Sequence, residues 1–270
     1  MKINKKFLSS CLVLCSVSAF SDPKSTDELT TELRDSFNYG ISTTFLSNFK
    51  ERGLSEHFSS LIFSPYISSS YVKRLPVTVS LMVNKSLVGE KKATLGNTVI
   101  STSGRFNNYF GYSSSLILPT SEASRKVKKN LFSLVNGINF SESRSFNNGV
   151  SINATVMATH NFSQFKYKTD IYGSSNNVHS FSELLSLSTS YKKVSFGFTF
   201  GVSQNFSHNW TMTEGYFSSE SLRVGVSNNL SLSLVHSNGG SLLAPNGEDL
   251  GIDLFDRDND TFSVNASFNF

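Results

Sequence analysis

The last ten residues of the chain alternate strictly between apolar and polar side chains. Residues 261–270 read TFSVNASFNF, in which serine or asparagine separates Phe262, Val264, Ala266, Phe268 and Phe270. Successive side chains of a β-strand point to opposite faces, so this pattern predicts a strand with one apolar and one polar face. Soluble β-sandwiches and membrane β-barrels both contain such strands, and the rest of the chain must decide between them.

Similar alternation recurs along most of the chain, without the three- and four-residue steps of an amphipathic helix. It predicts strands at residues 36–46, 59–71, 76–88, 97–104, 109–118, 130–143, 148–161, 181–191, 194–209, 215–227, 230–237 and 258–270. These are about twelve strands, an even number, and most reach the length that a tilted membrane-spanning strand needs.

The predicted connections alternate between short and long. Short turns are expected near residues 73–75, 105–108, 146–147, 192–193 and 228–229, and longer loops at 47–58, 89–96, 119–129, 162–180, 210–214 and 238–257. If both termini lie on one side, all short turns share that side and all long loops share the other. Outer-membrane barrels have this asymmetry, with short periplasmic turns and longer external loops. The pattern predicts an all-β fold, a transmembrane antiparallel up-and-down β-barrel over residues 36–270.

Composition agrees with a barrel. Charged residues make up only 16% of the chain and hydrophobic residues 38%, while serine and asparagine are abundant. Small hydroxyl and amide groups suit the inside of a barrel because they form hydrogen bonds without the desolvation cost of an ion. No run beyond the N-terminal region approaches the 18 apolar residues of a spanning helix.

The N-terminus has the pattern of a cleaved secretory signal. Lys2, Lys5 and Lys6 precede a mostly apolar run over residues 7–20, so residues 1–21 are expected to be a signal peptide. Both cysteines lie inside it, which leaves no disulfide or cysteine-based metal site in the mature chain. Without the three signal lysines, 21 of the 24 basic residues remain against 20 acidic ones, and no basic patch points to nucleic acid.

Residues 22–35 do not alternate. Ser25 and Glu28 have the spacing of a capping box, which predicts a short helix in the periplasm or a plug inside the barrel. A disordered segment is the alternative.

An open sheet edge in lipid leaves backbone groups without hydrogen-bond partners, so the last strand is expected to pair with the first. In the first strand, Phe37, Tyr39, Ile41 and Phe45 share one face that suits lipid. Aromatic residues near strand ends are expected to form girdles at the two membrane interfaces: Tyr71, Tyr109, Phe110, Tyr112, Tyr191, Phe206 and Phe270.

These features together resemble the Gram-negative outer-membrane β-barrel proteins over residues 36–270. The most specific element is the C-terminal strand that ends on Phe270. The resemblance implies that this strand is the signal read by the barrel-assembly machinery. It also implies an outer-membrane location, with membrane lipid and lipopolysaccharide as partners.

Signals for catalysis and metal binding are weak. His57 and Ser59 lie two residues apart on a face with Leu61 and Phe63, which resembles the His and Ser of outer-membrane phospholipase, but no asparagine is placed to orient the histidine. His160, His179, His208 and His236 have no ligand spacing. The acidic stretch 253–260 lacks the glycine and glutamate of a calcium loop. We expect no metal and no cofactor.

The polar strand faces predict the lining of the lumen. The main candidates are Asn153, Thr155, Ser186, Ser188, Thr199, Arg223 and Asn265. Arg223 is the only charge in this prediction, whereas ion-selective pores use rings of one sign. The sequence therefore predicts a passive, weakly selective channel for small polar solutes, with loops 162–180 and 238–257 at its mouth. A surface barrel that binds partners through external loops, and a membrane-face hydrolase, are the alternatives.

Overall fold

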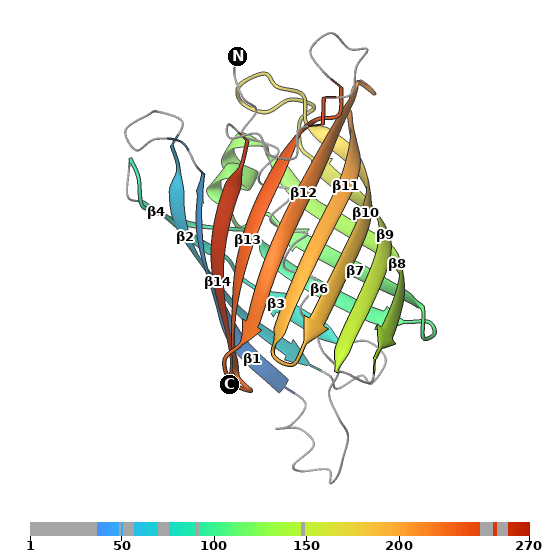
Figure 1. The fold of residues 1–270 in the computed structure, drawn as a ribbon. Coiled ribbons are helices and arrows are strands. Elements are labelled where there is room, and N and C mark those ends of the chain that lie inside the picture. Colours follow the sequence, from blue (N-terminus) through green and yellow to red (C-terminus); the bar gives the residue numbers. More distant parts are fainter. Residues whose placement is uncertain are drawn as a thin grey trace, which may run out of the picture. The chain divides into compact units, whose positions relative to one another are not determined.

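The computed structural model describes residues 37–48, 50, 57–69, 76–89, 92–146, 149–243, 251–252 and 259–270. These residues form one antiparallel sheet of fourteen strand segments that curls into a barrel (Figure 1). The predicted signal peptide and the segment 22–35 lie outside the described residues and stay predictions.

The strand segments follow one another around the wall in chain order. They are β1 (Phe37–Asn48), β2 (Ser59–Ser69), β3 (Val77–Ser80), β4 (Val83–Ser86), β5 (Ala93–Leu95), β6 (Thr98–Arg105), β7 (Phe110–Leu118), β8 (Asn130–Ser145), β9 (Val150–Phe165), β10 (Asn177–Tyr191), β11 (Val194–Ser207), β12 (Met212–Gly225), β13 (Leu230–Ser241) and β14 (Thr261–Asn269). A short π-helix, η1 (Ala123–Val127), lies between β7 and β8. None of the described residues form a helix with the length and apolar character of a membrane span.

Two of the barrel's strands are interrupted, which explains why fourteen segments make twelve strands. β3 and β4 are parts of one strand, and the break between them faces Pro65, which has no N–H for the ladder. β5 and β6 are parts of the next strand. Val83 pairs with Leu95 and the Gly96 N–H donates to the Met82 carbonyl, but Ser80 pairs with Val99, so one extra residue forms a bulge between Gly96 and Val99. The predicted twelve-stranded barrel is confirmed.

The sheet closes between its first and last strands. β1 pairs with β2 on one side and with β14 on the other, in a register that runs from Gly40 opposite Asn269 to Asn48 opposite Thr261. The Phe270 N–H extends this ladder by donating to the Tyr39 carbonyl at 3.0 Å. The predicted pairing of the two ends is confirmed. β1 and β14 each have a hydrogen-bonded neighbour on both sides.

The two faces of the wall differ in chemistry. Apolar side chains of the alternating pattern are exposed on the outer face, as with Ile138, which is 63% exposed. Aromatic rings gather near the ends of the strands. Tyr39 stacks on Phe270 and Tyr109 on Phe140 at the end with the short turns, with ring centroids 5.5 and 6.0 Å apart. Near the loop end, Phe181 meets Phe206 edge to face. Of the predicted girdle residues, Tyr71 lies outside the described residues.

Several strands extend further toward the loop end than predicted. The expected loop 162–180 is wrong in extent, because β9 continues to Phe165 and β10 begins at Asn177. The expected loop 210–214 shortens to the four residues between Ser207 and Met212. These extensions lack apolar alternation, since their outer face carries polar residues such as Gln164 and Glu214. Backbone pairing with the neighbouring strands keeps these residues extended, although no alternation in the sequence marks them.

A substitution at Gly40 tests how closely the two strands of the closing seam approach each other. A Cβ at this position would lie 2.5 Å from the Phe268 carbonyl oxygen, a backbone atom that moves only if β1 and β14 separate. We expect Gly40→Ala to lower the free energy of unfolding by about 1–3 kcal/mol, as overpacking does. Urea unfolding of the refolded protein in lipid vesicles measures this change. Gly225→Ala is the matched control, because its Cβ would meet no atom closer than 3.7 Å. Equal stability of both variants would contradict a tight seam.

Candidate permeation pathway

The inner face of the barrel is built from rows of residues that strand register places side by side. One row crosses eight successive strands and contains only hydroxyl and amide side chains: Ser141, Thr155, Ser186, Thr199, Ser219, Ser237, Thr261 and Asn48. Three predicted lumen residues, Thr155, Ser186 and Thr199, are neighbours in this row. Side chains opposite each other in a β-ladder share a face, so the row forms a polar band on the inner wall.

A second row lies nearer the turn end of the barrel. It runs through Ser145, Ser151, Ser190, Ser195, Arg223, Ser233, Asn265 and Thr44. The predicted residues Arg223 and Asn265 are both in this row, separated by one strand. Asn153 and Ser188 are cross-strand partners in the row between the two. The structure thus brings all seven predicted residues to three neighbouring rows of one face.

Hydrogen bonds between the rows' own side chains keep these groups flat against the wall. Ser141 and Thr155 hydroxyls are 2.9 Å apart, those of Ser186 and Thr199 are 3.0 Å apart, and those of Ser151 and Ser190 are 2.6 Å apart. Thr44 donates to Asn265 across the closing seam. Each hydroxyl keeps further donor or acceptor capacity for water or a solute. The inner wall is therefore polar, and most side chains in these rows are short.

Charged residues of the described strands are sorted between the two faces. The four acidic ones, Glu142, Glu183, Glu214 and Glu220, all pair in register with outer-face positions. Two arginines lie on the inner face, Arg223 and Arg105, the latter opposite Gly111. The prediction that Arg223 is the single lumen charge is therefore wrong. The sequence pattern predicts a turn at Arg105, because the end of β6 has no apolar alternation that marks it as a strand.

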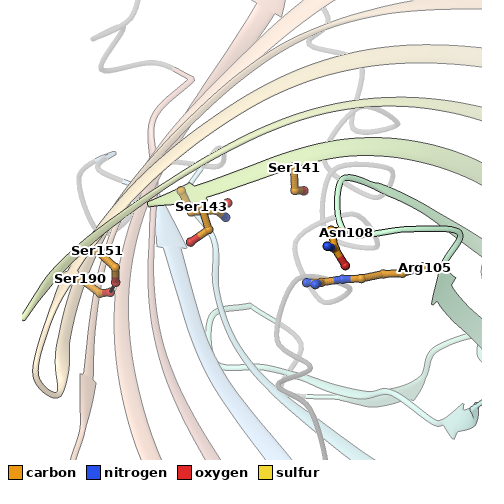
Figure 2. Close-up of a pocket in the computed structure, with 7 residues that line it drawn as sticks. Arg105, Asn108, Ser141, Ser143, Ser151 and Ser190 are labelled. Atoms are coloured by element: carbon orange, nitrogen blue, oxygen red, sulfur yellow. Dashed lines mark hydrogen bonds between the residues drawn. The ribbon is translucent and has the colours of Figure 1, made fainter. Parts of the chain in front are cut away.

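Arg105 lines a polar cavity of about 310 Å³ in the turn half of the barrel. The other lining residues are Asn108, Ser141, Ser143, Ser151, Asn153 and Ser190. Figure 2 shows the Arg105 side chain extending toward the wall that carries Ser143, Ser151 and Ser190. Arg223, in the same row as Ser151, donates a hydrogen bond to the Ser231 hydroxyl at 3.2 Å. Both inner cations therefore lie toward the end with the short turns.

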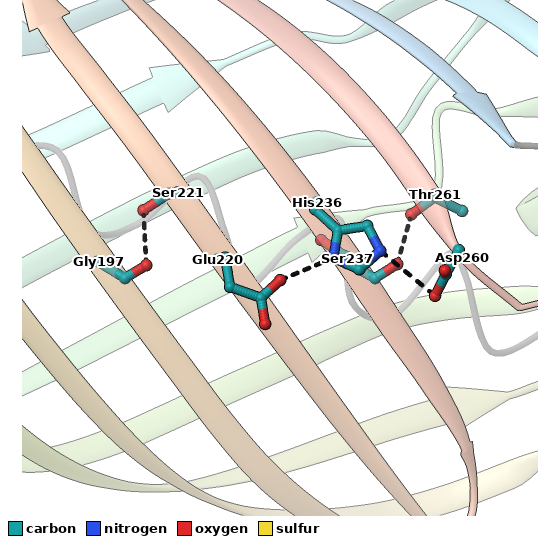
Figure 3. Close-up of polar contacts among 7 residues, drawn as sticks. All are labelled: Gly197, Glu220, Ser221, His236, Ser237, Asp260 and Thr261. Atoms are coloured by element: carbon teal, nitrogen blue, oxygen red, sulfur yellow. Dashed lines mark hydrogen bonds and ion pairs between the residues drawn. The ribbon is translucent and has the colours of Figure 1, made fainter. Parts of the chain in front are cut away.

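Strand pairing places several histidines next to ionisable residues that are distant in the sequence. His236 on β13 lies between two carboxylates, with Nδ1 2.7 Å from Glu220 and Nε2 3.3 Å from Asp260 (Figure 3). His160 and His179 on β9 and β10 are 3.1 Å apart at their ring nitrogens. Both clusters belong to the outer face by register. No group in the described part of the chain has the arrangement of a metal site.

The structure does not assemble His57 and Ser59 into a catalytic pair. Ser59 is the first residue of β2 and pairs with Ser47 on the outer face. No hydrogen bond joins the two side chains among the described residues, and the His57 Nδ1 atom is buried without a partner. Asn48 instead accepts a hydrogen bond from the Phe58 N–H at 3.1 Å. This geometry gives no support to the hydrolase alternative.

Two external loops pack together at the other end of the barrel. The Lys166 N–H donates to the Lys129 carbonyl at 2.9 Å, and the Ile171 N–H donates to the Val127 carbonyl at 3.2 Å. These loops carry six basic residues: Arg125, Lys126, Lys128, Lys129, Lys166 and Lys168. The only acids among them are Glu122, whose pKa is lowered by a hydrogen bond from Lys126, and Asp170. The loop end of the barrel on this side is therefore basic.

No protein-family model matches the sequence, and no curated protein sequence matches it. Solved structures do match the fold. An outer-membrane channel from Pseudomonas putida F1 aligns with a TM-score of 0.54 and 9% identity over 93% of this chain and 100% of that one. The two chains share the same β-barrel fold. The KdgM porin (TM-score 0.48, 8% identity, 86% of this chain and 99% of that one) and the NanC porin (0.47, 8%, 85% and 98%) also match. The chain has the closed β-barrel fold of the outer-membrane protein from Pseudomonas putida F1.

Single cysteines can test which face meets water, because both native cysteines lie within residues 1–21. Ser188 lies on the inner face, and its neighbour Leu187 lies on the outer face, where it is 46% exposed to lipid. In outer-membrane vesicles we expect a charged, membrane-impermeant thiosulfonate to modify Ser188→Cys but not Leu187→Cys. Mass spectrometry of the purified protein measures the modified fraction. Faster modification of Leu187→Cys would reverse the assignment of the two faces.

Proposed function

We propose that the protein is a passive outer-membrane channel for small polar solutes. The observation that carries this proposal is the inner face, where one row of hydroxyl and amide groups is continuous across eight strands. Such groups replace part of a solute's hydration by hydrogen bonds at little cost, and their small size leaves room along the axis.

The alternative of a surface barrel that only binds partners has less support. A barrel that serves only as a scaffold for its loops has its lumen filled by side chains, as in small barrels. Here the rows of Ser186 and Ser190 consist of short side chains apart from Arg223, and a cavity of about 310 Å³ is lined by Ser141, Ser151 and Ser190 of these rows. External loops could still bind partners, but a polar and partly hollow interior is not needed for that task.

Conductance of the refolded, full mature chain in planar bilayers tests the proposal. We expect discrete channel openings from protein whose folding is confirmed by a heat-dependent shift in gel migration. A folded barrel that gives no current would contradict passage and favour the surface-barrel alternative.

A bulky side chain in the inner row should reduce that current. Ser190→Trp places an indole on the inner wall beside Ser151, whereas Tyr191→Trp places one on the outer face, where an aromatic side chain already stands. We expect Ser190→Trp to lower single-channel conductance roughly two-fold or more, because the ring narrows the path. Tyr191→Trp should conduct like the natural protein. Equal conductance in all three proteins would show that ions do not pass along this wall.

We also propose that Phe270 is read by the barrel-assembly machinery. Phe270 packs on Tyr39 and, edge to face, on Phe268 at 4.8 Å, so its loss also removes packing. Phe268→Ala controls for that loss because Phe268 is in the same cluster. We expect Phe270→Ala to lower the amount of folded barrel in cell envelopes more than Phe268→Ala does, as measured by heat-dependent gel migration. An equal decrease in both would assign Phe270 a packing role only.

A further inference from the structure

We propose that the cavity around Arg105 binds small hydroxylated anions and makes the channel anion-selective. This inference rests on the proposed channel function and narrows its substrate class from polar solutes in general to small anions. It departs from the sequence-based expectation of a weakly selective pore, which counted Arg223 as the only inner charge.

The Arg105 guanidinium is available to a ligand. It forms no ion pair and no hydrogen bond with any described residue, and it is exposed within the barrel. By contrast, Arg144 on the outer face is paired with Glu142 at 3.0 Å. A guanidinium keeps its charge at all relevant pH values and presents five N–H donors in a planar fork that fits a carboxylate or a phosphate.

The surroundings of Arg105 suit an anion that also carries hydroxyl groups. Besides the guanidinium, the described residues that line the cavity contribute two amides and four serine hydroxyls, and none of them is a carboxylate. The serine hydroxyls can donate to an anion or accept from a sugar-like hydroxyl. The volume of about 310 Å³ equals that of roughly ten liquid water molecules, enough for a six-carbon acid.

Arg223 adds a second positive charge along the same path. It is the other inner charge of the described strands, and no acid of those strands lies on the inner face. At the opposite end, two packed loops carry six basic residues against two acids, but residues 242–260 of another loop carry six acids and one arginine. The inner arginines are therefore the charges that favour anions, because positive charge along a narrow aqueous path raises the local concentration of anions and lowers that of cations.

The reversal potential of single channels in a KCl gradient tests the proposal. We expect a chloride-to-potassium permeability ratio above one at about 0.1 M salt, where charges act over ~10 Å, and a ratio nearer one at about 1 M salt. Arg105→Gln should lower this ratio about two-fold or more, because it removes one of two inner charges. Arg144→Gln is the matched control, since it removes the same charge from the outer face and should leave the ratio unchanged.

Block of the chloride current tests the binding site separately. Gluconate has a carboxylate on a polyhydroxy chain, and sorbitol is its uncharged counterpart. We expect millimolar gluconate, but not sorbitol, to reduce the current through the natural protein. Arg105→Gln should weaken this block several-fold, whereas Arg144→Gln should not.

The outcomes separate the two proposals. Open channels with a permeability ratio at or below one, or with equal ratios for the natural protein and Arg105→Gln, would overturn anion selectivity while leaving the channel function in place. Equal block by gluconate and sorbitol would overturn the binding site. A folded protein without any current would overturn the channel function itself and this inference with it.

Discussion

The structure depends on one constraint, which is that a sheet in lipid must have no free edge. Every unpaired N–H and C=O in the hydrocarbon region costs several kcal/mol, so the sheet is stable in a membrane only when it closes on itself. The seam between β1 and β14 meets this requirement with a continuous register that ends at the Phe270 N–H. Gly40 and the aromatic pair Tyr39 and Phe270 lie on this seam, and both depend on close approach of the two strands.

Closure also determines where each side chain goes, because it gives the sheet an inside and an outside. Alternation then assigns apolar residues to lipid and hydroxyl or amide residues to the interior. The strand charges follow a further pattern, in which arginines lie on both faces while all four strand acids are on the outer one. The inner face of the described strands carries two arginines and no acid, so its net charge is positive.

Several ionisable residues on the outer face have partners on neighbouring strands. His160 and His179 pair near the loop end of β9 and β10, and Asp260, which precedes β14 at that end, is linked through His236 to Glu220 in the middle of β12. Strands that extend beyond the apolar band bring their polar outer faces to the headgroup region, where ions stay hydrated. This arrangement accounts for strands of up to sixteen residues, longer than the bilayer requires.

The sequence by itself determined the fold class, the twelve strands, the closing pair and the polar face, because alternation with a period of two shows which face of the sheet each side chain is on. The residues of the inner rows, such as Thr155 and Ser186, followed from the same parity. What only the tertiary structure decided is which of these residues are neighbours, since register joins positions that are far apart in the chain. Arg105 and Ser190, which line one cavity, and His236 between Glu220 and Asp260 are examples. The ends of strands also required the structure, because beyond the apolar band no alternation marks them and pairing alone keeps the chain extended.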